Sequence, residues 1–207
     1  MNGLPKTPND PMDIDVQLVK AVQAGDMTAF DGLVQQHKDR LFNLVYRFLG
    51  DYQEADECAQ EVFIKVFKSI NSFRFESTFS TWLYRIAVNT CKNKLKSSGY
   101  RWKKRTVSIE NPEGPKGGNP LPEIANGAPS PMATLETKER WMRVQQAVNA
   151  LPEEQNTVVV LRDIQGLSYQ EISDITGLNL GTVKSKLARA RLALRNMLKP
   201  ILNDNIK

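Results

Sequence analysis

Aromatic and basic side chains are concentrated in one segment of the first half of the chain. Five aromatic rings fall within twelve residues: Phe73, Phe75, Phe79, Trp82 and Tyr84. Between Glu76 and Glu110 there is no acidic residue, while eight cations are present: Arg85, Lys92, Lys94, Lys96, Arg101, Lys103, Lys104 and Arg105. Cationic side chains hold phosphates, and aromatic rings stack on unpaired bases. The segment therefore predicts a surface that binds single-stranded nucleic acid.

A helix over residues 81–96 would bring the cations of this segment onto one face. Its inward side would hold Leu83, Ala87 and Thr90, and its outward side Arg85, Asn89, Lys92 and Lys96. An asparagine on such a face can read a base edge, while the cations hold the backbone. The alternative interpretation assigns most of the aromatic rings, Phe79 and Trp82 among them, to the core.

A second basic stretch, near the other end of the chain, lies in a segment with the pattern of a helix-turn-helix. Ser168 and Glu171 have the spacing of a capping box, in which the hydroxyl and the carboxylate each accept a backbone amide proton. The short helix that they open would bury Ile172 and Ile175 and end at Gly177. A longer helix begins at about Leu180, after the short glycine-containing turn that is typical of two crossed helices.

The longer helix has an apolar stripe opposite a face of small and basic residues. The stripe consists of Val183, Leu187, Ala190 and Leu194, and the opposite face with its flanks consists of Thr182, Lys184, Ser185, Lys186, Ala188 and Arg189. No acidic residue occurs from residue 175 to 203. Such a face can enter the major groove of DNA, where arginine forks onto guanine. The alternative is a solvated basic face on a small bundle.

Helical periodicity dominates the whole chain, so the expected fold class is all-α. In the first half, one stripe consists of Phe30, Val34, His37, Leu41, Leu44 and Phe48 and ends at Gly50, and the next consists of Ala55, Ala59, Val62, Val66 and Ile70. His37, the only histidine, lies on the first stripe, and we expect it in the core or at an interface. A later stripe consists of Trp141, Val144, Val148 and Leu151 and ends at Pro152.

Proline and glycine divide the chain into two domains. Residues 111–131 contain six prolines and four glycines, a composition that does not sustain a helix. We expect a flexible tail at residues 1–12, a helical domain at 13–98, a linker at 99–137, and a second helical domain at 138–207.

Composition excludes several classes of function. No apolar run reaches the roughly 20 residues of a membrane helix, and residues 1–11 lack the apolar core of a signal peptide. We therefore expect no membrane insertion and a cytoplasmic location. Cys58 and Cys91 form neither a CxxC pair nor a disulfide framework, so we interpret them as reduced apolar residues, with a redox role as the alternative. Because no nucleotide loop, metal cluster or nucleophile arrangement occurs, we expect no cofactor, no metal and no enzyme activity.

Three ordered motifs carry a family likeness. Residues 56–63 read DECAQEVF, residues 79–89 read FSTWLYRIAVN, and residues 181–185 read GTVKS. In this order and spacing they resemble the extracytoplasmic-function (ECF) sigma factors, group 4 of the sigma-70 family of RNA polymerase sigma factors. The resemblance covers both expected domains and implies that the first is sigma region 2 and the second is sigma region 4, the helix-turn-helix.

The resemblance also implies partners and residue roles. The protein would contact core RNA polymerase at its flap and at the clamp helices of its largest subunit. The residues that contact the clamp helices would be Asp56, Gln60 and Glu61. The minus 10 promoter element would be bound by Phe73, Arg74, Phe75, Ser77, Thr78, Arg85, Asn89 and Lys92. The minus 35 element would be read by the outer face of the helix from Leu180. Ala188 departs from family members with a bulkier side chain there, so the minus 35 sequence is not transferable. An anti-sigma factor, a stress or envelope response, and association with the nucleoid when active are further implications.

Two other functions fit parts of the pattern. A conventional helix-turn-helix regulator would use the same second domain, with the first domain as a sensing or dimerising module. The first domain, however, offers a basic aromatic face where such a regulator needs an apolar pocket or a dimer seam. An enzyme acting on nucleic acid would need catalytic carboxylates or a metal cluster among the basic faces.

Overall fold

The computed structural model describes residues 11–97 and 131–203, and all regular elements in these ranges are helical. The first range holds α1 (Pro11–Gln23), α2 (Thr28–Leu49), α3 (Tyr52–Ser69), the short 3₁₀ helix η1 (Ile70–Ser72) and α4 (Phe79–Lys96). The second holds α6 (Pro131–Asn149), α7 (Glu153–Val159), the π-helical turn η2 (Val160–Ile164), α8 (Tyr169–Thr176) and α9 (Leu180–Asn203). The expected all-α class is therefore confirmed for the described residues.

Several sequence-based expectations fall outside the described residues. They are the tail up to residue 10, the linker from residue 99 to 130, and the four cations Arg101, Lys103, Lys104 and Arg105. The second helical range begins earlier than expected, because α6 starts at Pro131, inside the expected linker. Proline fits the first turn of a helix, where its missing N–H has no partner to lose.

Local signals determine where α2 ends and α3 begins. Gly50 terminates α2 in a left-handed conformation with φ of 74°, which a residue without a β-carbon adopts without strain. The carboxylate of Asp51 then accepts the amide proton of Glu54 at 2.9 Å and caps α3. The expected stripe on α3, from Ala55 to Ile70, is buried throughout.

The stripe on α2 is only partly correct. His37, Leu41, Leu44 and Phe48 are buried as expected, but Phe30 and Val34 are only half-buried, and the core positions of that first part are Ala29 and Leu33. The reason is that Phe30 lies at the edge of the core, where its ring packs edge-on against Phe67 of α3 at 5.0 Å. His37 is in the core, with Nε2 2.8 Å from a carboxylate oxygen of Asp15 on α1.

Most of the aromatic rings that precede and begin α4 are core residues. Phe73, Phe79, Trp82 and Tyr84 are buried, and only Phe75 is exposed. Phe73 contacts the rings of Phe79 and Trp82, with centroid distances of 6.2 and 5.1 Å. The interpretation of Phe79 and Trp82 as core residues is therefore the correct one.

The second half contains the expected helix-turn-helix. Both hydrogen bonds of the capping box at Ser168 and Glu171 are present, and α8 ends at Gly177, with φ of 72°. On α9, Val183, Leu187 and Ala190 are buried, and Leu194 is partly buried. On α6 one expectation was wrong: Val144 is 39% exposed, whereas Val148 and Leu151 are buried.

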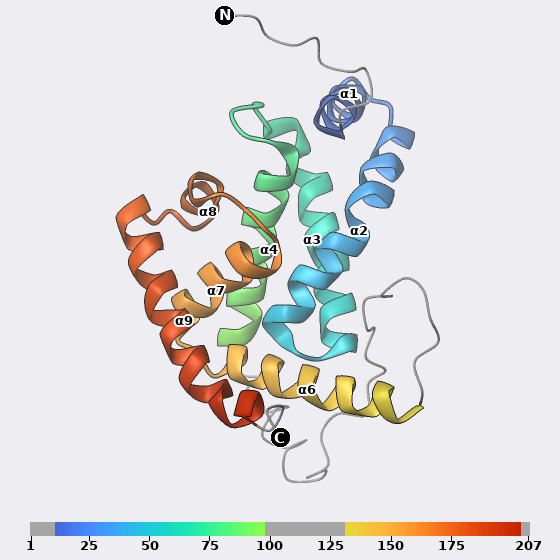
Figure 1. The fold of residues 1–207 in the computed structure, drawn as a ribbon. Coiled ribbons are helices and arrows are strands. Elements are labelled where there is room, and N and C mark those ends of the chain that lie inside the picture. The colour runs from blue at the N-terminus through green and yellow to red at the C-terminus, as the bar shows by residue number, and fades with distance from the viewer. Residues whose placement is uncertain (1–10, 98–130, 204–207) are drawn as a thin grey trace, which may run out of the picture.

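The two halves pack against each other through α4 and α2. Figure 1 shows α4 between α3 on one side and α7 and α8 on the other. Across the bottom of the same view, α6 passes beneath α2 and α3, and the Arg47 guanidinium of α2 lies 3.5 Å from the centre of the Trp141 ring of α6. The side chain of Gln145 donates to the Arg47 carbonyl at 2.8 Å. A helix packed on both sides has little free surface, and this determines which candidate residues are accessible.

Candidate nucleic-acid interface

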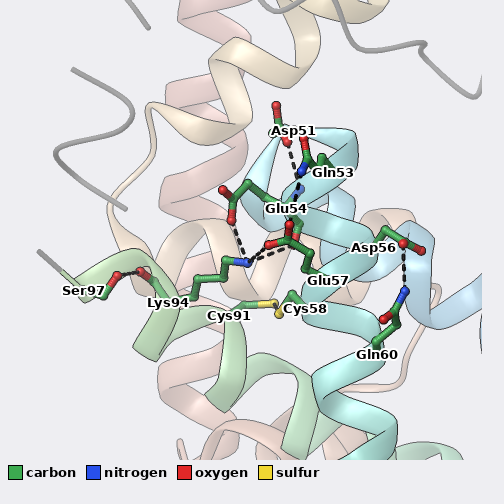
Figure 2. A network of polar contacts seen from close by, with 10 residues as sticks. All are labelled: Asp51, Gln53, Glu54, Asp56, Glu57, Cys58, Gln60, Cys91, Lys94 and Ser97. Carbon is green, nitrogen blue, oxygen red and sulfur yellow. Dashed lines mark hydrogen bonds and ion pairs between the residues drawn. The ribbon is translucent and has the colours of Figure 1, made fainter. Parts of the chain in front are cut away.

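An exposed polar face runs along the first three turns of α3. Asp56, Gln60 and Glu61 are all exposed, and the Gln60 amide donates to the Asp56 carboxylate at 2.9 Å. Glu61 pairs with Lys65 one turn later at 2.7 Å. In Figure 2, Asp56 and Gln60 point away from the side of α3 that meets α4. The three residues are thus available to a partner, and they carry two carboxylates.

The opposite side of α3 is tied to α4 by a lysine. Lys94 Nζ lies 2.6 Å from a carboxylate oxygen of Glu54 and 3.5 Å from one of Glu57, as Figure 2 shows. Burial alone would lower the pKa of Lys94, but the hydrogen bond and the charge of Glu54 outweigh it and raise that pKa. Lys94 therefore joins two helices and is not part of a free basic face. Its spacing from Ala87 and Cys91 places Lys94 on the inward stripe of α4. This spacing, and not the composition of the segment, is the signal that Lys94 faces α3.

The loop before α4 holds a side chain in a strained backbone conformation. Phe75 has φ of 59°, in the left-handed region that few residues other than glycine adopt, and its side chain is exposed. The amide of Gln23 on α1 donates to the carbonyls of Ile70 at 2.8 Å and Phe73 at 3.1 Å and so holds the start of this loop. Sequence reasoning missed Gln23, because no local pattern connects it to a loop about fifty residues away.

The end of the loop starts α4. Thr78 is the cap of α4, since its hydroxyl accepts the amide proton of Thr81 at 3.1 Å. Ser77 is partly buried, and Arg74 is exposed. Phe73 is 7% exposed, so its ring supports the loop from beneath and is not free to stack on a base.

The residues expected at the minus 10 element fall into two groups. Phe73, Arg74, Ser77 and Arg85 line one hollow of about 620 Å³, whose other wall includes Asp174 of α8. Asn89 lines a separate hollow of about 400 Å³ between α3 and α4, beside Lys65 and Lys68. The structure therefore does not bring Asn89 to the loop.

The cations near the end of α4 face the second half of the chain. Lys92 and Lys96 lie 3.7 and 3.5 Å from the same carboxylate oxygen of Glu153, at the start of α7. Four cations of the expected single-strand surface lie in the described residues: Arg85, Lys92, Lys94 and Lys96. Only Arg85 has no ion-pair partner within residues 11–97 and 131–203. The single-strand surface is thus largely matched with carboxylates.

The outer face of α9 is more open. Lys184, Ser185, Ala188 and Arg189 are exposed, while Thr182 and Lys186 are partly buried. Lys186 forms an ion pair with Glu154, whereas Arg189 has no ion-pair partner among the residues that the structure describes. Asn179, which the sequence analysis did not single out, accepts the amide proton of Thr182 at 2.8 Å and caps the helix. Its place one residue before α9 is a capping signal.

The described ranges contain neither a metal-binding cluster nor a helix suited to cross a membrane. No group of three or more histidine, cysteine, aspartate or glutamate residues there has the arrangement of a metal site. None of the described helices combines the length and the apolar composition that crossing a membrane requires.

Comparison with known proteins agrees with this arrangement. The model of the family "Sigma-70 region 2" matches residues 33–100, and that of "Sigma-70, region 4" matches residues 141–194. RNA polymerase sigma-H factor of Pseudomonas aeruginosa is 40% identical over 190 residues, covering 92% of this chain and 96% of its own. ECF RNA polymerase sigma-E factor of Escherichia coli strain K12 is 38% identical over 188 residues, covering 91% and 96%.

Solved structures share the fold. CnrH, in complex with the cytosolic domain of CnrY, has a TM-score of 0.64 at 23% identity and covers 91% of this chain and 99% of its own. RpoE of Bartonella quintana, in complex with the anti-sigma factor NepR, has a TM-score of 0.59 at 21% identity, covering 82% and 96%. The matched regions, their order along the chain and the identity over nine-tenths of two named relatives lead to one assignment. This chain belongs to the sigma-70 family of RNA polymerase sigma factors, in the extracytoplasmic-function group.

Proposed function

We propose that this protein binds core RNA polymerase, directs it to a particular set of promoters and promotes strand opening there. The observation that carries the proposal is the presence, in order, of region 2 and region 4 in one chain, each with an exposed polar face. A conventional helix-turn-helix regulator has no need of the first of these regions. The site of action is the cytoplasm, at the nucleoid when the factor is engaged.

Reconstituted transcription tests this function directly. Purified core polymerase is mixed with the protein and a library of promoter fragments, and the transcripts are sequenced. We expect specific starts that depend on the protein and share a minus 35 and a minus 10 element. Repression or activation of a polymerase that already carries another sigma factor, with no starts from core polymerase alone, would support the regulator instead.

The polymerase contact is assigned to the face of α3 that carries Asp56, Gln60 and Glu61. Acidic and polar groups on an exposed helix fit a basic partner surface, and complementary charge also speeds association. We expect the double change Gln60→Ala with Glu61→Lys to abolish binding to core polymerase while the helical content stays the same. Isothermal titration and circular dichroism measure the two quantities.

A matched control for that variant lies on α2. Gln35 and Asp39 are exposed and, like Gln60 and Glu61, consist of a glutamine and an acidic residue, so Gln35→Ala with Asp39→Lys changes the net charge equally on a different helix. It should leave polymerase affinity unchanged. Equal losses from both double variants would reduce the effect to net charge and remove the assignment of α3.

Minus 10 recognition is assigned to the 73–78 loop and the outward side of α4. Phe75 supports this assignment, because strained residues gather at binding sites and its exposed ring is available to stack on a base. Phe73 supports the loop, Arg74, Ser77 and Arg85 line the first hollow, and Thr78 caps α4 beside it. Asn89 and Lys92 lie further along α4 and contact DNA beyond it. Strand opening in this proposal is driven by binding, since capturing unpaired bases offsets unstacking that costs a few kcal/mol per step.

Minus 35 recognition is assigned to α9. Ser185, Ala188 and Arg189 face the base edges, and Thr182, Lys184 and Lys186 hold the phosphates on either side. Regulation by an anti-sigma factor, in a stress or envelope response, completes the proposal. CnrH and RpoE of Bartonella quintana, which share this fold, were solved as complexes with CnrY and with the anti-sigma factor NepR, respectively.

A further inference from the structure

The two cysteines of the chain are neighbours in the core. Cys58 on α3 and Cys91 on α4 are 33 positions apart in sequence, yet their sulfurs are 3.9 Å apart. Neither residue has any exposed surface. Figure 2 shows the two side chains pointing toward each other between the helices. A disulfide has an S–S distance of about 2.05 Å, so the sulfurs need to approach by roughly 2 Å to bond.

The pair is chemically asymmetric. A hydrogen bond joins the two sulfurs, and this contact, with help from the charge of Lys94, lowers the pKa of Cys58. The same hydrogen bond, together with burial, raises the pKa of Cys91 well above its ordinary value. The thiolate is the nucleophilic form of cysteine. Cys58 is therefore the thiol that reacts first, and Cys91 is placed to resolve the product.

The cover over Cys58 is ionic on one side. Lys94 and Glu54, whose contact joins the helices there, have side chains that are 19% and 9% exposed. Lys94 also reaches Glu57, whose side chain is 54% exposed. Exposed side chains change rotamer rapidly, and Glu57 is the exposed member of this layer. For hydrogen peroxide to reach the sulfur, the contacts of Lys94 with these carboxylates have to open.

We propose that Cys58 and Cys91 form a thiol pair that hydrogen peroxide converts reversibly into a disulfide, and that this disulfide weakens polymerase binding. In the first step the Cys58 thiolate attacks one peroxide oxygen, the O–O bond breaks, and hydroxide leaves and is protonated to water. Cys58 becomes a sulfenic acid. The Cys91 sulfur then gives up its proton and attacks the Cys58 sulfur, forming the S–S bond and releasing the second oxygen as water. Two thiols and one peroxide give one disulfide and two waters, with two electrons passing from sulfur to oxygen.

The effect on binding follows from where the cysteines lie, and it rests on the proposed function. Cys58 is two residues from Asp56 and from Gln60, on the helix whose outer face is assigned to the polymerase. Cys91 lies in the same way between Asn89 and Lys92 on α4. Because the sulfurs need to approach by roughly 2 Å, closing the bond draws the two helices together. The outer face of α3 then leaves the geometry that its partner recognises.

The test uses the full chain and the variant Cys91→Ala, which keeps the reactive thiol and removes the resolving one. Each protein is reduced, treated with hydrogen peroxide, blocked with an alkylating agent in denaturant, digested and analysed by mass spectrometry. The affinity for core polymerase is measured before oxidation, after it, and after re-reduction. Thermal melting of the reduced proteins checks that Cys91→Ala is folded, and Cys58→Ala serves as a second variant that cannot react first.

We expect the unaltered chain to give a linked peptide pair containing Cys58 and Cys91 and to bind polymerase about tenfold more weakly until it is re-reduced. Neither variant should show the link or the reversible loss. The proposal would be overturned if peroxide treatment of the native protein left both thiols reduced, and so still alkylated afterwards, at concentrations that oxidise them in the denatured protein. A disulfide that leaves polymerase affinity unchanged would also overturn it. Failure of the reduced protein to bind polymerase, with the link still forming, would instead overturn the proposed function.

Discussion

The two candidate DNA surfaces of this chain differ in what they face. The minus 10 surface on α4 lies against the second half of the molecule, where Lys92 and Lys96 meet Glu153 and the hollow beside Arg85 is bounded by Asp174. The minus 35 surface on α9 faces away from α4, and its central arginine, Arg189, is exposed. Both are basic in sequence, but carboxylates of the second half are paired with more of the cations on the first surface than on the second.

The difference teaches that a basic composition does not by itself give an available surface. Under the assignment proposed above, DNA contacts Lys92 on α4 only after separation of that residue from Glu153, and the contact of Arg47 with Trp141 and Gln145 holds the two halves together. Burial lowers the pKa of Arg47 to about 10, so the side chain is still charged at neutral pH. Minus 35 binding needs no such separation. The two surfaces should therefore respond differently to changes that loosen the second half.

The largest contrast is expected from a core change in the second half. Leu187 is 2% exposed on α9, and truncating a buried leucine costs about 2 to 5 kcal/mol, which is a large part of the stability of a small domain. Leu187→Ala should abolish binding to a minus 35 duplex while it preserves or strengthens binding to a minus 10 oligonucleotide. Thermal melts and anisotropy titrations measure both. Leu192→Ala, at a position 60% exposed, is the matched control and should change neither. Parallel loss of both activities in Leu187→Ala would mean that the halves fold as one unit.

The next contrast separates base reading from charge on α9. Arg189→Ala should cost about 1 to 3 kcal/mol on the preferred minus 35 duplex and relax the preference at one base pair. Lys199→Ala removes a cation beyond the turns that enter the groove, so it should weaken all duplexes alike and lower the salt slope by about one. A panel of single-base variants at two salt concentrations distinguishes the two effects. A uniform loss with Arg189→Ala would show that α9 docks by another side.

Sequence patterns predicted the elements of this fold better than the environment of its side chains. The capping box at Ser168, the stop at Gly177 and the core stripe on α3 depend on local spacing, and all are present. Phe30 and Val144 were misplaced because a helical stripe about 100° wide leaves its boundary residues undecided until the packing partner is known.

The candidate sites show the same division. Asp56, Gln60 and Arg189 lie outside the apolar stripe of their helices, and all three are exposed. The pairing of Lys94 with Glu54, which joins residues forty apart, did not follow from the sequence, because composition counts a cation without saying what it faces. Long-range contacts of this kind depend on how the helices meet, and no local pattern encodes that.

A smaller contrast concerns base reading on α4. Asn89 and Asn93 both line the hollow between α3 and α4, and both are exposed. Asn89→Ala should weaken binding to a single-stranded minus 10 oligonucleotide by about 1 kcal/mol more than binding to a scrambled one, the net value of a hydrogen bond. Asn93→Ala should affect the two oligonucleotides equally. Competition titrations measure the ratio, and equal losses with Asn89→Ala would reduce that residue to a backbone or structural contact.

The smallest effect tests the contrast between the surfaces most directly. Glu153→Gln removes the charge that faces Lys92 and Lys96, so more positive potential on α4 is available to DNA. Exposed ion pairs are weak, so we expect the affinity for the minus 10 oligonucleotide to exceed that of the unaltered chain only about twofold to fivefold at low salt and to equal it in high salt. Glu154→Gln makes the same change in net charge at the next residue, but Glu154 faces Lys186 of α9. This control should therefore favour the minus 35 duplex and change affinity for the minus 10 oligonucleotide much less than Glu153→Gln does, because the charge of Glu154 acts mainly on Lys186 and only weakly on Lys92. If both variants raised the affinity for both DNA ligands equally, net charge alone would explain the result, and the carboxylate of Glu153 on α7 would not screen the cations of α4.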